Sequence, residues 1–391
     1  MRYFLITTFI VIVLSLHFFY AHAQVHPGTQ NNGNEVTNVT VAVPFLLITP
    51  DARAGAMGEA GVAVLPDVNV MSINPSKLAY LNDPYGFSMS YSPWLNNLNS
   101  DMNFVYLSGY YKVAKNSAVG TSLRYFSLGE VQLFDRDRQD LGTYRPNEFA
   151  LDIAYSRMFG ESFSLGTAVS YIRSNLSSGK FSDGQETKPA NALAVDVSGY
   201  VRNETILFRK DVILSLGINI SNIGTKVSYA EGADKFFLPA NLKLGGASTF
   251  LLDNLNQLTF ALDFNKLLVP TQPVYDQDGK IIRGRDPNVS VPAGIFGSFN
   301  DAPGGAREEF SEVSIATGLE YSYNKQFAVR CGYFYEDPKK GDRRYFTTGV
   351  GLKYQSFSLD LAYLISGVEN SPLANTLRFS LTFTPFKAGT L

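Results

Sequence analysis

Bulky apolar and small or polar side chains alternate along most of the chain after Tyr85, and this period of two limits the fold more than any other feature. Between Ser162 and Arg173 the odd positions are mostly bulky, whereas the even positions are mostly small or polar. Successive residues of a strand point to opposite faces, so each such segment has one apolar face. The pattern predicts strands at 85–93, 102–113, 117–127, 147–158, 162–173, 190–202, 211–221, 239–250, 256–266, 310–322, 325–336, 343–354, 356–366 and 373–386.

The lengths of these segments and of their connections favour a membrane barrel. A tilted membrane strand needs about 9–11 residues, and outer-membrane barrels join their strands by short periplasmic turns and longer external loops. Short connections alternate here with long ones, the longest being about 267–309. We therefore expect an all-β fold, a 14-stranded antiparallel transmembrane outer-membrane β-barrel, with loops at the cell surface and both termini in the periplasm.

The composition supports a lipid-facing wall. Phe, Tyr and Trp make up 13% of the chain, and charged residues only 17%, against roughly 25% in ordinary soluble domains. A soluble β-sandwich is the alternative, but it should carry fewer aromatic residues. Aromatic girdles lie at both interfaces of a barrel. The candidates near strand ends are Tyr85, Phe87, Tyr91, Tyr321, Tyr323, Tyr333, Tyr335, Tyr345 and Phe346.

The N-terminus has the features of an export signal. Arg2 precedes the uncharged apolar run Tyr3–Phe19, and Ala21-His22-Ala23 is a small-x-small cleavage site. We expect a signal peptide at 1–23, with a single anchoring helix as the alternative. The polar segment 24–40 should be a flexible periplasmic arm. A Gly- and Ala-rich plug-like segment follows at 41–84, then the barrel at 85–386 and a tail at 387–391.

Charged residues in the middle of the strands fall on the small-residue face. An Arg or Lys facing lipid at the bilayer midplane costs about 2–4 kcal/mol, so these charges should point into the lumen. A structural network of paired charges is favoured there, and a substrate path is the alternative. The predicted lumen charges are Arg124, Asp152, Asp196, Asp263, Arg330, Asp360 and Arg378.

The chain offers little for catalysis, metal or nucleic-acid binding. Its three histidines are His17, His22 and His26, so the barrel region has none and Ser-His catalysis is disfavoured. Cys331 is the single cysteine, which excludes a multi-cysteine metal site. The net charge of −2 gives no reason to expect nucleic acid as a partner. We expect no catalytic residues, no metal and no cofactor.

The segment after residue 50 resembles the plug of a known family. Ala52-Arg53-Ala54-Gly55-Ala56-Met57-Gly58, followed by Gly61-Val62-Ala63, Asp67 and Asn74-Pro75, is similar to the N-terminal plug of FadL-type barrels. Three stretches resemble more closely the PorV (LptO) family, the FadL-like outer-membrane proteins of the type IX secretion system. They are 44–53 (PFLLITPDAR), 299–305 (FNDAPGG) with Glu308-Glu309, and 372–379 (PLANTLRF). The plug residues that carry the resemblance are Arg53, Met57, Asp67, Asn74 and Pro75.

The resemblance implies a non-enzymatic protein in the outer membrane, surrounded by its lipid. PorV-type proteins bind cargo through its C-terminal signal domain and hand it from the large translocon barrel to surface attachment and sortase-like components. The C-terminus departs from the usual barrel pattern, because Phe386 is followed by Lys-Ala-Gly-Thr-Leu. Two other functions stay open. One is a FadL-like transporter of hydrophobic small molecules; the other, a lipid A deacylase, is disfavoured by the missing histidines.

The long connection at 267–309 exceeds what a hairpin needs, and loops of this length usually have a role or packing of their own. Its segment 291–299 is apolar although we expect it outside the membrane, and an exposed apolar patch favours a partner site. The alternative is that the loop folds into the mouth of its own barrel. The predicted partner-binding residues are Pro292, Ile295, Phe296, Phe299, Asp301, Pro303 and Gly304.

Overall fold

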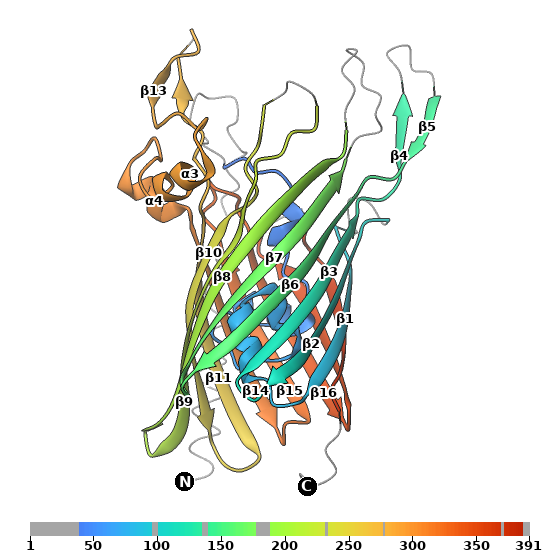
Figure 1. The fold of residues 1–391 in the computed structure, drawn as a ribbon, viewed down its shortest axis with the longest axis vertical. Helices are drawn as coiled ribbons and strands as arrows, with labels where there is room; N and C mark the ends of the chain where they lie inside the picture. The colour runs from blue at the N-terminus through green and yellow to red at the C-terminus, as the bar shows by residue number, and fades with distance from the viewer. Residues whose placement is uncertain are drawn as a thin grey trace. The chain divides into compact units, whose positions relative to one another are not determined.

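The fold is a closed antiparallel barrel of fourteen strands, which confirms the predicted fold class (Figure 1). The computed structural model describes residues 39–95, 101–134, 140–176, 188–230, 234–276, 278–368 and 371–385. Around the ring the strands are β1 (Tyr85–Pro93), β18 (Leu377–Phe383), β17 (Phe357–Ser366), β16 (Arg344–Tyr354), β15 (Phe327–Tyr335), β14 (Val313–Tyr323), β11 (Asn256–Leu267), β10 (Asn241–Leu251), β9 (Lys210–Gly224), β8 (Ala190–Leu207), β7 (Phe163–Asn175), β6 (Asn147–Phe159), β3 (Ser117–Ser127) and β2 (Asn103–Ala114).

The strands alternate between an exposed and a buried face, as the period of two predicts. On β7, for example, Leu165 and Val169 are exposed, whereas Gly166 and Ser170, the residues that follow them, are buried. The outward side chains are mostly large and apolar, and Cys331 is exposed among them. The apolar face of the sheet therefore faces the surroundings of the barrel, and the small-residue face lines its lumen.

The two ends of the barrel differ in their connections (Figure 1). The short-turn end has connections such as 115–116, 208–209 and 355–356. The long-loop end carries the remaining secondary structure. Its elements are the hairpin β4 (Val131–Phe134) and β5 (Asp140–Tyr144), β12 (Val274–Tyr275), β13 (Ile281–Arg283), α3 (Val291–Gly297) and α4 (Ala306–Ser311).

Three local predictions need correction. Strand β8 continues past residue 202 to Leu207, and β9 begins at Lys210. A two-residue turn joins them at Phe208 and Arg209, both with positive φ, as the tightest hairpins require. The last strand begins at Leu377 instead of residue 373, because Asn375 adopts a left-handed conformation and Leu373 packs against the lumen clusters. Tyr345 belongs to no outer girdle, because it is buried in the lumen and stacks on Phe334.

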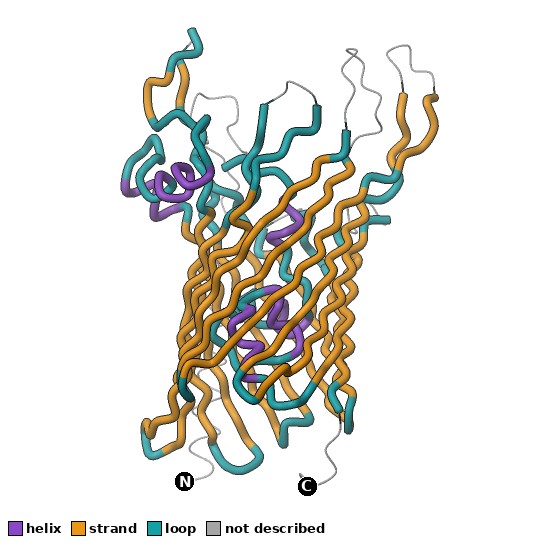
Figure 2. The backbone as a smooth tube through the Cα atoms, viewed as in Figure 1, coloured by secondary structure: helices purple, strands orange, loops and turns teal. Residues whose placement is uncertain are grey.

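The segment before β1 fills the lumen with short helical turns, as its Gly- and Ala-rich sequence suggests (Figure 2). Asp51, Asp67 and Asn74 stand at N-cap positions, where each side chain accepts a hydrogen bond from a backbone N–H of the turn that follows. These turns are η2 (Pro44–Leu47), α2 (Ala52–Ala56), η3 (Val68–Ser72) and η4 (Pro75–Tyr80). We call residues 42–84 the plug.

The plug runs through the barrel from one end to the other. The backbone N–H of Ala42 donates to Phe237 O at the long-loop end, and Lys112 N donates to Pro84 O beside the short connection at 115–116. Val39 and Val41 also pack at the long-loop end, so the last residues of the predicted periplasmic arm lie at the end away from the short turns. The rest of the arm, the predicted signal peptide and the tail 387–391 lie outside the described residues.

Within the described ranges, no helix is both long enough and apolar enough to cross a bilayer.

Candidate functional site

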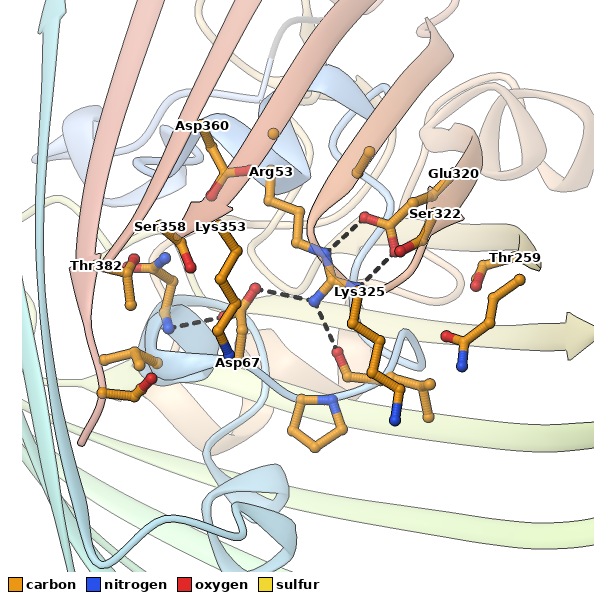
Figure 3. Close-up of a pocket in the computed structure, with 18 of the residues that line it drawn as sticks. Arg53, Asp67, Thr259, Glu320, Ser322, Lys325, Lys353, Ser358, Asp360 and Thr382 are labelled. Atoms are coloured by element: carbon orange, nitrogen blue, oxygen red, sulfur yellow. Dashed lines mark hydrogen bonds and ion pairs between the residues drawn. The ribbon is translucent and has the colours of Figure 1, made fainter. Parts of the chain in front are cut away.

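The plug is fixed to the wall by a chain of ion pairs centred on Arg53. Its guanidinium donates to Glu320 of β14 at 2.9 and 2.8 Å and to Asp67 at 3.0 Å (Figure 3). Arg330 of β15 donates to the same Glu320 at 2.6 Å and to Asp360 of β17 at 2.6 Å. Two arginines thus share three carboxylates, and the network joins the plug to three strands.

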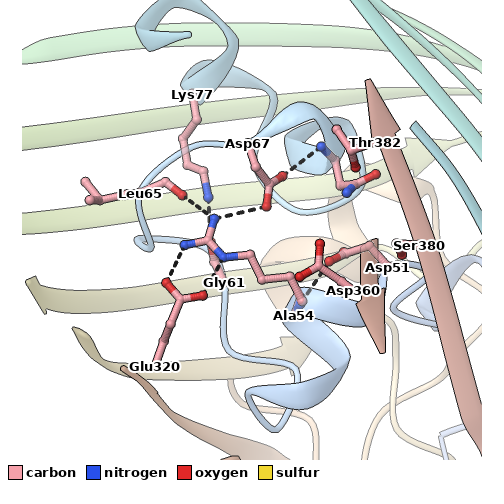
Figure 4. Close-up of polar contacts among 12 residues, drawn as sticks. Asp51, Ala54, Gly61, Leu65, Asp67, Lys77, Glu320, Asp360, Ser380 and Thr382 are labelled. Carbon is pink, nitrogen blue, oxygen red and sulfur yellow. Dashed lines mark hydrogen bonds and ion pairs between the residues drawn. The ribbon is translucent and has the colours of Figure 1, made fainter. Parts of the chain in front are cut away.

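A second group of contacts holds the middle of the plug. Asp263 of β11 accepts hydrogen bonds from the backbone N–H groups of Gly61 and Val62 at 2.7 and 2.9 Å. Lys77 donates to the carbonyl of Gly61 at 2.7 Å (Figure 4), and Asn74 donates to the carbonyls of Val62 and of Gly199 on β8. The turn at 61–62 is therefore bound from the wall and from the plug itself.

Close approach of the plug backbone to β15 explains one glycine. A Cβ atom on Gly332 of β15 would lie 2.1 Å from the backbone nitrogen of Gly58. Next to this contact, Thr347 of β16 accepts from Gly58 N at 2.8 Å and donates to Ala56 O at 2.9 Å. Only a residue without a side chain lets strand and plug meet here.

The residues predicted as lumen charges lie on the inward face and contact the plug, each other or neighbouring residues of the wall. Arg124 donates to the carbonyl of Leu46 at 3.0 Å, and Arg378 pairs with Glu59 at 3.2 Å. Asp152 accepts from Ser122, and Asp196 accepts from the backbone N–H of Asn222. The predicted plug residues Met57 and Pro75 are also buried, Met57 against Gly318 of β14 and Pro75 close to Gly166 of β7.

A polar cavity of about 620 Å³ remains at the short-turn end. The network around Arg53 forms part of its lining, and Lys325, Lys353 and Ser322 line it as well (Figure 3). Polar and charged residues make up most of its lining, so the cavity offers hydrogen-bond partners to water and polar solutes.

The long loop forms a second feature, which we call the cap and define as residues 289–312. Its helices α3 and α4 lie against the outside of the barrel rim at the long-loop end (Figure 1). Ile295 packs in a cluster with Leu242 of β10 and Ile220 of β9. These two side chains point outward, because they lie on the same faces of their strands as the exposed Leu244 and Ile218. The cap therefore leans on the outer side of the wall.

Buried ion pairs anchor the cap below its helices. Lys266 of β11 pairs with Glu309 and Glu312 at 3.0 and 2.7 Å, and these three side chains are at most 11% exposed. Lys340, from the connection between β15 and β16, pairs with Glu308 and Glu312 at 2.5 and 3.0 Å. Three acidic residues around α4 are thereby fixed by one lysine of the wall and one of a neighbouring connection.

Asp301 lies in the same polar layer and is 4% exposed. It accepts a hydrogen bond from the backbone N–H of Thr271 at 3.2 Å. The pKa of Asp301 is raised to about 6, mainly by burial and also by the nearby carboxylates of Glu309 and Glu312, against the lowering effects of the Thr271 hydrogen bond and of Lys266.

The predicted partner-binding residues fall into two groups, one packed against the barrel and one exposed. Ile295 and Asp301 face the barrel rim and are unavailable to a partner. Phe296 is 80% exposed and Phe299 51%, and the sequence reasoning missed Phe310, which is 79% exposed on α4. Pro292 and Gly304 are exposed and Pro303 is half-buried. An aromatic residue inside a short acidic helix was the only signal for Phe310.

Across the described ranges, no cluster of three or more His, Cys, Asp or Glu side chains could hold a metal ion. The features that remain are a plugged lumen and an anchored apolar cap on a lipid-facing barrel.

Comparison with protein families decides the affiliation. The model of the type IX secretion system protein PorV matches residues 30–274, more than half of the chain. The chain belongs to the PorV family. It is accordingly an outer-membrane component of the type IX secretion system, and the family that it matches is not an enzyme family. No curated protein sequence matches it significantly.

Solved structures of barrels resemble the PorV-family fold described here. The monoaromatic hydrocarbon channel CymD shares 11% identity with a TM-score of 0.51, covering 87% of this chain and 98% of its own. A mutant of the monoaromatic hydrocarbon channel TodX lacking S2 and S3 shares 12% identity with a TM-score of 0.50, covering 85% and 96%. At such low identity the likeness extends to the FadL-like fold alone.

Proposed function

We propose that this PorV-family barrel binds secreted cargo through its C-terminal signal domain and hands it from the translocon barrel to the surface attachment and sortase-like components. In this proposal the short turns face the periplasm and the cap stands at the cell surface. The observation that carries it is the cap, where Phe296, Phe299 and Phe310 are exposed while the glutamates of the cap pair with Lys266 and Lys340. Aromatic residues on a rigid support are typical anchors of protein interfaces.

The anchoring of the cap favours a role in binding a partner over a role only in stabilising the barrel rim. Its acidic residues are held by Lys266 and Lys340, and Glu309 also accepts from the backbone N–H groups of Asp301 and Ala302. A surface that is ordered before it meets its partner loses less conformational entropy on binding. We infer that the anchored cap is built to present its phenylalanines.

The second candidate function is FadL-like transport of hydrophobic molecules. Its motivation is the fold shared with hydrocarbon channels. Two observations count against it. Hydrogen bonds and ion pairs hold the plug in the lumen in addition to apolar packing, and polar and charged residues make up most of the lining of the cavity at the short-turn end. A hydrophobic solute would have to displace these contacts without replacing them.

The test replaces the three exposed phenylalanines by serine (F296S/F299S/F310S) and leaves the anchoring residues intact. Deleting the whole loop would be less informative, because Ile295 and Gly294 belong to the packed side. A matched control is Phe260→Ser, an exposed phenylalanine of β11 in the outer wall. We expect the triple variant to fold but to lose most surface cargo and most co-purified cargo.

Retention of cargo by the triple variant at the level of the Phe260→Ser control would refute the role of the cap. Uptake of a labelled hydrocarbon by cells tests the second candidate function, transport of hydrophobic molecules. If deleting the gene lowers this uptake and leaves secretion intact, transport replaces cargo binding as the function.

A further inference from the structure

The outer wall of the barrel has a groove where two outward side chains are small. The strand register places Phe87 of β1, Gly109 of β2, Thr121 of β3 and Ile153 of β6 in one row across the sheet. Phe87 and Ile153 are 57% and 62% exposed and stand at the two ends of this row. Gly109 and Thr121 lie between them and form the floor.

This groove has a volume of about 790 Å³ and a nearly apolar lining. Met89, Leu107 and Leu123 border it on one side of the row, and Tyr111 and Val119 border it on the other. The hydroxyl of Thr121 donates to the backbone carbonyl of Asp152 at 3.0 Å, so the threonine offers its methyl group to the groove. A ligand here has almost no polar partner to bind.

The polar atoms of the neighbouring residues are turned away and already bonded. Ser108 donates to the carbonyl of Val68 in the plug at 2.9 Å, and Ser122 donates to Asp152 at 2.7 Å. Water does not fill a site that gives it no hydrogen bonds. The occupant must therefore be apolar, and the groove is continuous with the apolar outer face, which in a membrane barrel borders on hydrocarbon.

We propose that the groove at Gly109 and Thr121 is a fixed binding site for an acyl chain of a membrane phospholipid. A chain of methylene groups matches an open apolar groove, and the membrane supplies such chains along the whole wall. The groove extends toward Tyr85, the first residue of β1, and Phe383, the last of β18, at the short-turn end. With short turns in the periplasm, this end lies in the leaflet made of phospholipid, so the choice of lipid rests on the proposed orientation.

The site is independent of the cargo role. It lies on β1, β2, β3 and β6, across the ring from β9, β10 and β11, against which the cap packs. A lipid held here would remain with the protein through gentle solubilisation, unlike the lipids that exchange freely around the wall.

The test fills the groove by Gly109→Leu and uses Gly246→Leu as the matched control. Gly246 of β10 lies on the outward register too, and its added Cβ would meet no atom closer than 3.5 Å. Both variants and the natural protein are purified from outer membranes in a mild non-ionic detergent, and their bound lipid is measured by native mass spectrometry. Heat-modifiable migration on gels identifies the folded barrel.

We expect one retained phospholipid on the natural protein and on Gly246→Leu. On Gly109→Leu its occupancy should fall about tenfold, the change expected when two buried methylene groups lose their contacts. Equal occupancy in all three proteins overturns the proposal, and so does retention of lipid A in place of phospholipid.

A second measurement needs no variant. Phosphatidylethanolamine with a diazirine in its acyl chain is incorporated into vesicles that contain the natural protein, and the photolabelled peptides are sequenced. Labels concentrated at 85–89, 105–123 and 151–153 support the site. Labels spread evenly around the outer wall, or a co-purified protein covering these residues, refute it.

Discussion

Arg53 of the plug and Glu320 of the barrel wall form a two-point ion pair, with Nε–Oε2 and Nη2–Oε1 distances of 2.9 and 2.8 Å. The two residues are separated by 267 positions in the chain. Glu320 also accepts from Arg330 of the neighbouring strand. The pair therefore links the plug to a charge network that belongs to the wall.

Arg53→Ala should destabilise the seating of the plug. It leaves Asp67 and Glu320 without a partner from α2, and breaking a buried ion pair costs up to about 3–5 kcal/mol. We expect a lower unfolding temperature and faster protease cleavage within 42–84. Arg145→Ala is the control, because Arg145 forms an exposed pair with Glu130, and such pairs contribute about 0–1 kcal/mol. An Arg53→Ala barrel as stable as the control would contradict this role.

Gly332→Ala should displace the plug or prevent folding. The new methyl group would lie 2.1 Å from the backbone nitrogen of Gly58, and a backbone contact cannot rotate away. We expect reduced heat-modifiable barrel and, in the fraction that folds, faster amide exchange at 56–62. Gly246→Ala, with its nearest atom at 3.5 Å, should match the natural protein in both measurements. Unchanged exchange in Gly332→Ala would show that the plug shifts without cost.

The cap should become less stable as the pH rises from about 4 to about 6. The pKa of Asp301 is raised to about 6 from the ordinary value of 3.8, so the folded cap binds a proton that the unfolded loop has released. An acid with a raised pKa favours the folded state at low pH, and this contribution is lost as the pH passes the folded pKa.

Hydrogen exchange of residues 298–312, corrected for intrinsic rates, measures this effect. Protection should be higher at pH 4.5 than at pH 7.5, and Asp301→Asn should reduce the difference, because its amide stays neutral. The same difference in Asp301→Asn as in the natural protein would assign the titration to another group.

Lys266→Met should loosen the cap and leave the barrel intact. The change leaves Glu309 without its lysine and Glu312 with Lys340 alone, and a buried carboxylate without its partner is costly. We expect faster proteolysis between 284 and 312, with unchanged heat-modifiable migration. Lys280→Met, at an exposed position of the same long connection, serves as the control. Equal cleavage of both variants would argue that apolar packing alone holds the cap.

The barrel could be predicted from sequence because its signal is local. Most strands show their own alternation, so the positions of β6 and β7, for instance, needed no knowledge of their neighbours, whereas 102–113 is apolar on both faces. The turn at Phe208 and Arg209 escaped prediction, because positive φ values usually fall on Gly, Asn or Asp. Tyr345 was assigned to the wrong face because it lies near a strand end, where aromatic residues usually mark a girdle.

The contacts of the plug could not be predicted. The sequence indicates that the mid-strand charges point inward, but the partner of each depends on which stretch of plug lies at its height. Arg53 with Glu320 and Ala56 with Thr347 are pairs of this kind. The cap shows the same limit, since its apolar content is visible in the sequence, whereas the division between Ile295, which is packed, and Phe296, which is exposed, depends on the rim.

The passage of the chain through its own barrel constrains how the protein is assembled. From Ala42 the chain enters at one end of a closed ring and leaves at the other before β1 begins. The ring is completed by the pairing of β1 with β18, and the backbone N–H of Ala52 donates to Ser380 on that last strand at 2.8 Å. We therefore expect assembly by wrapping rather than threading, in which the plug is gathered first and the final strand closes the wall around it.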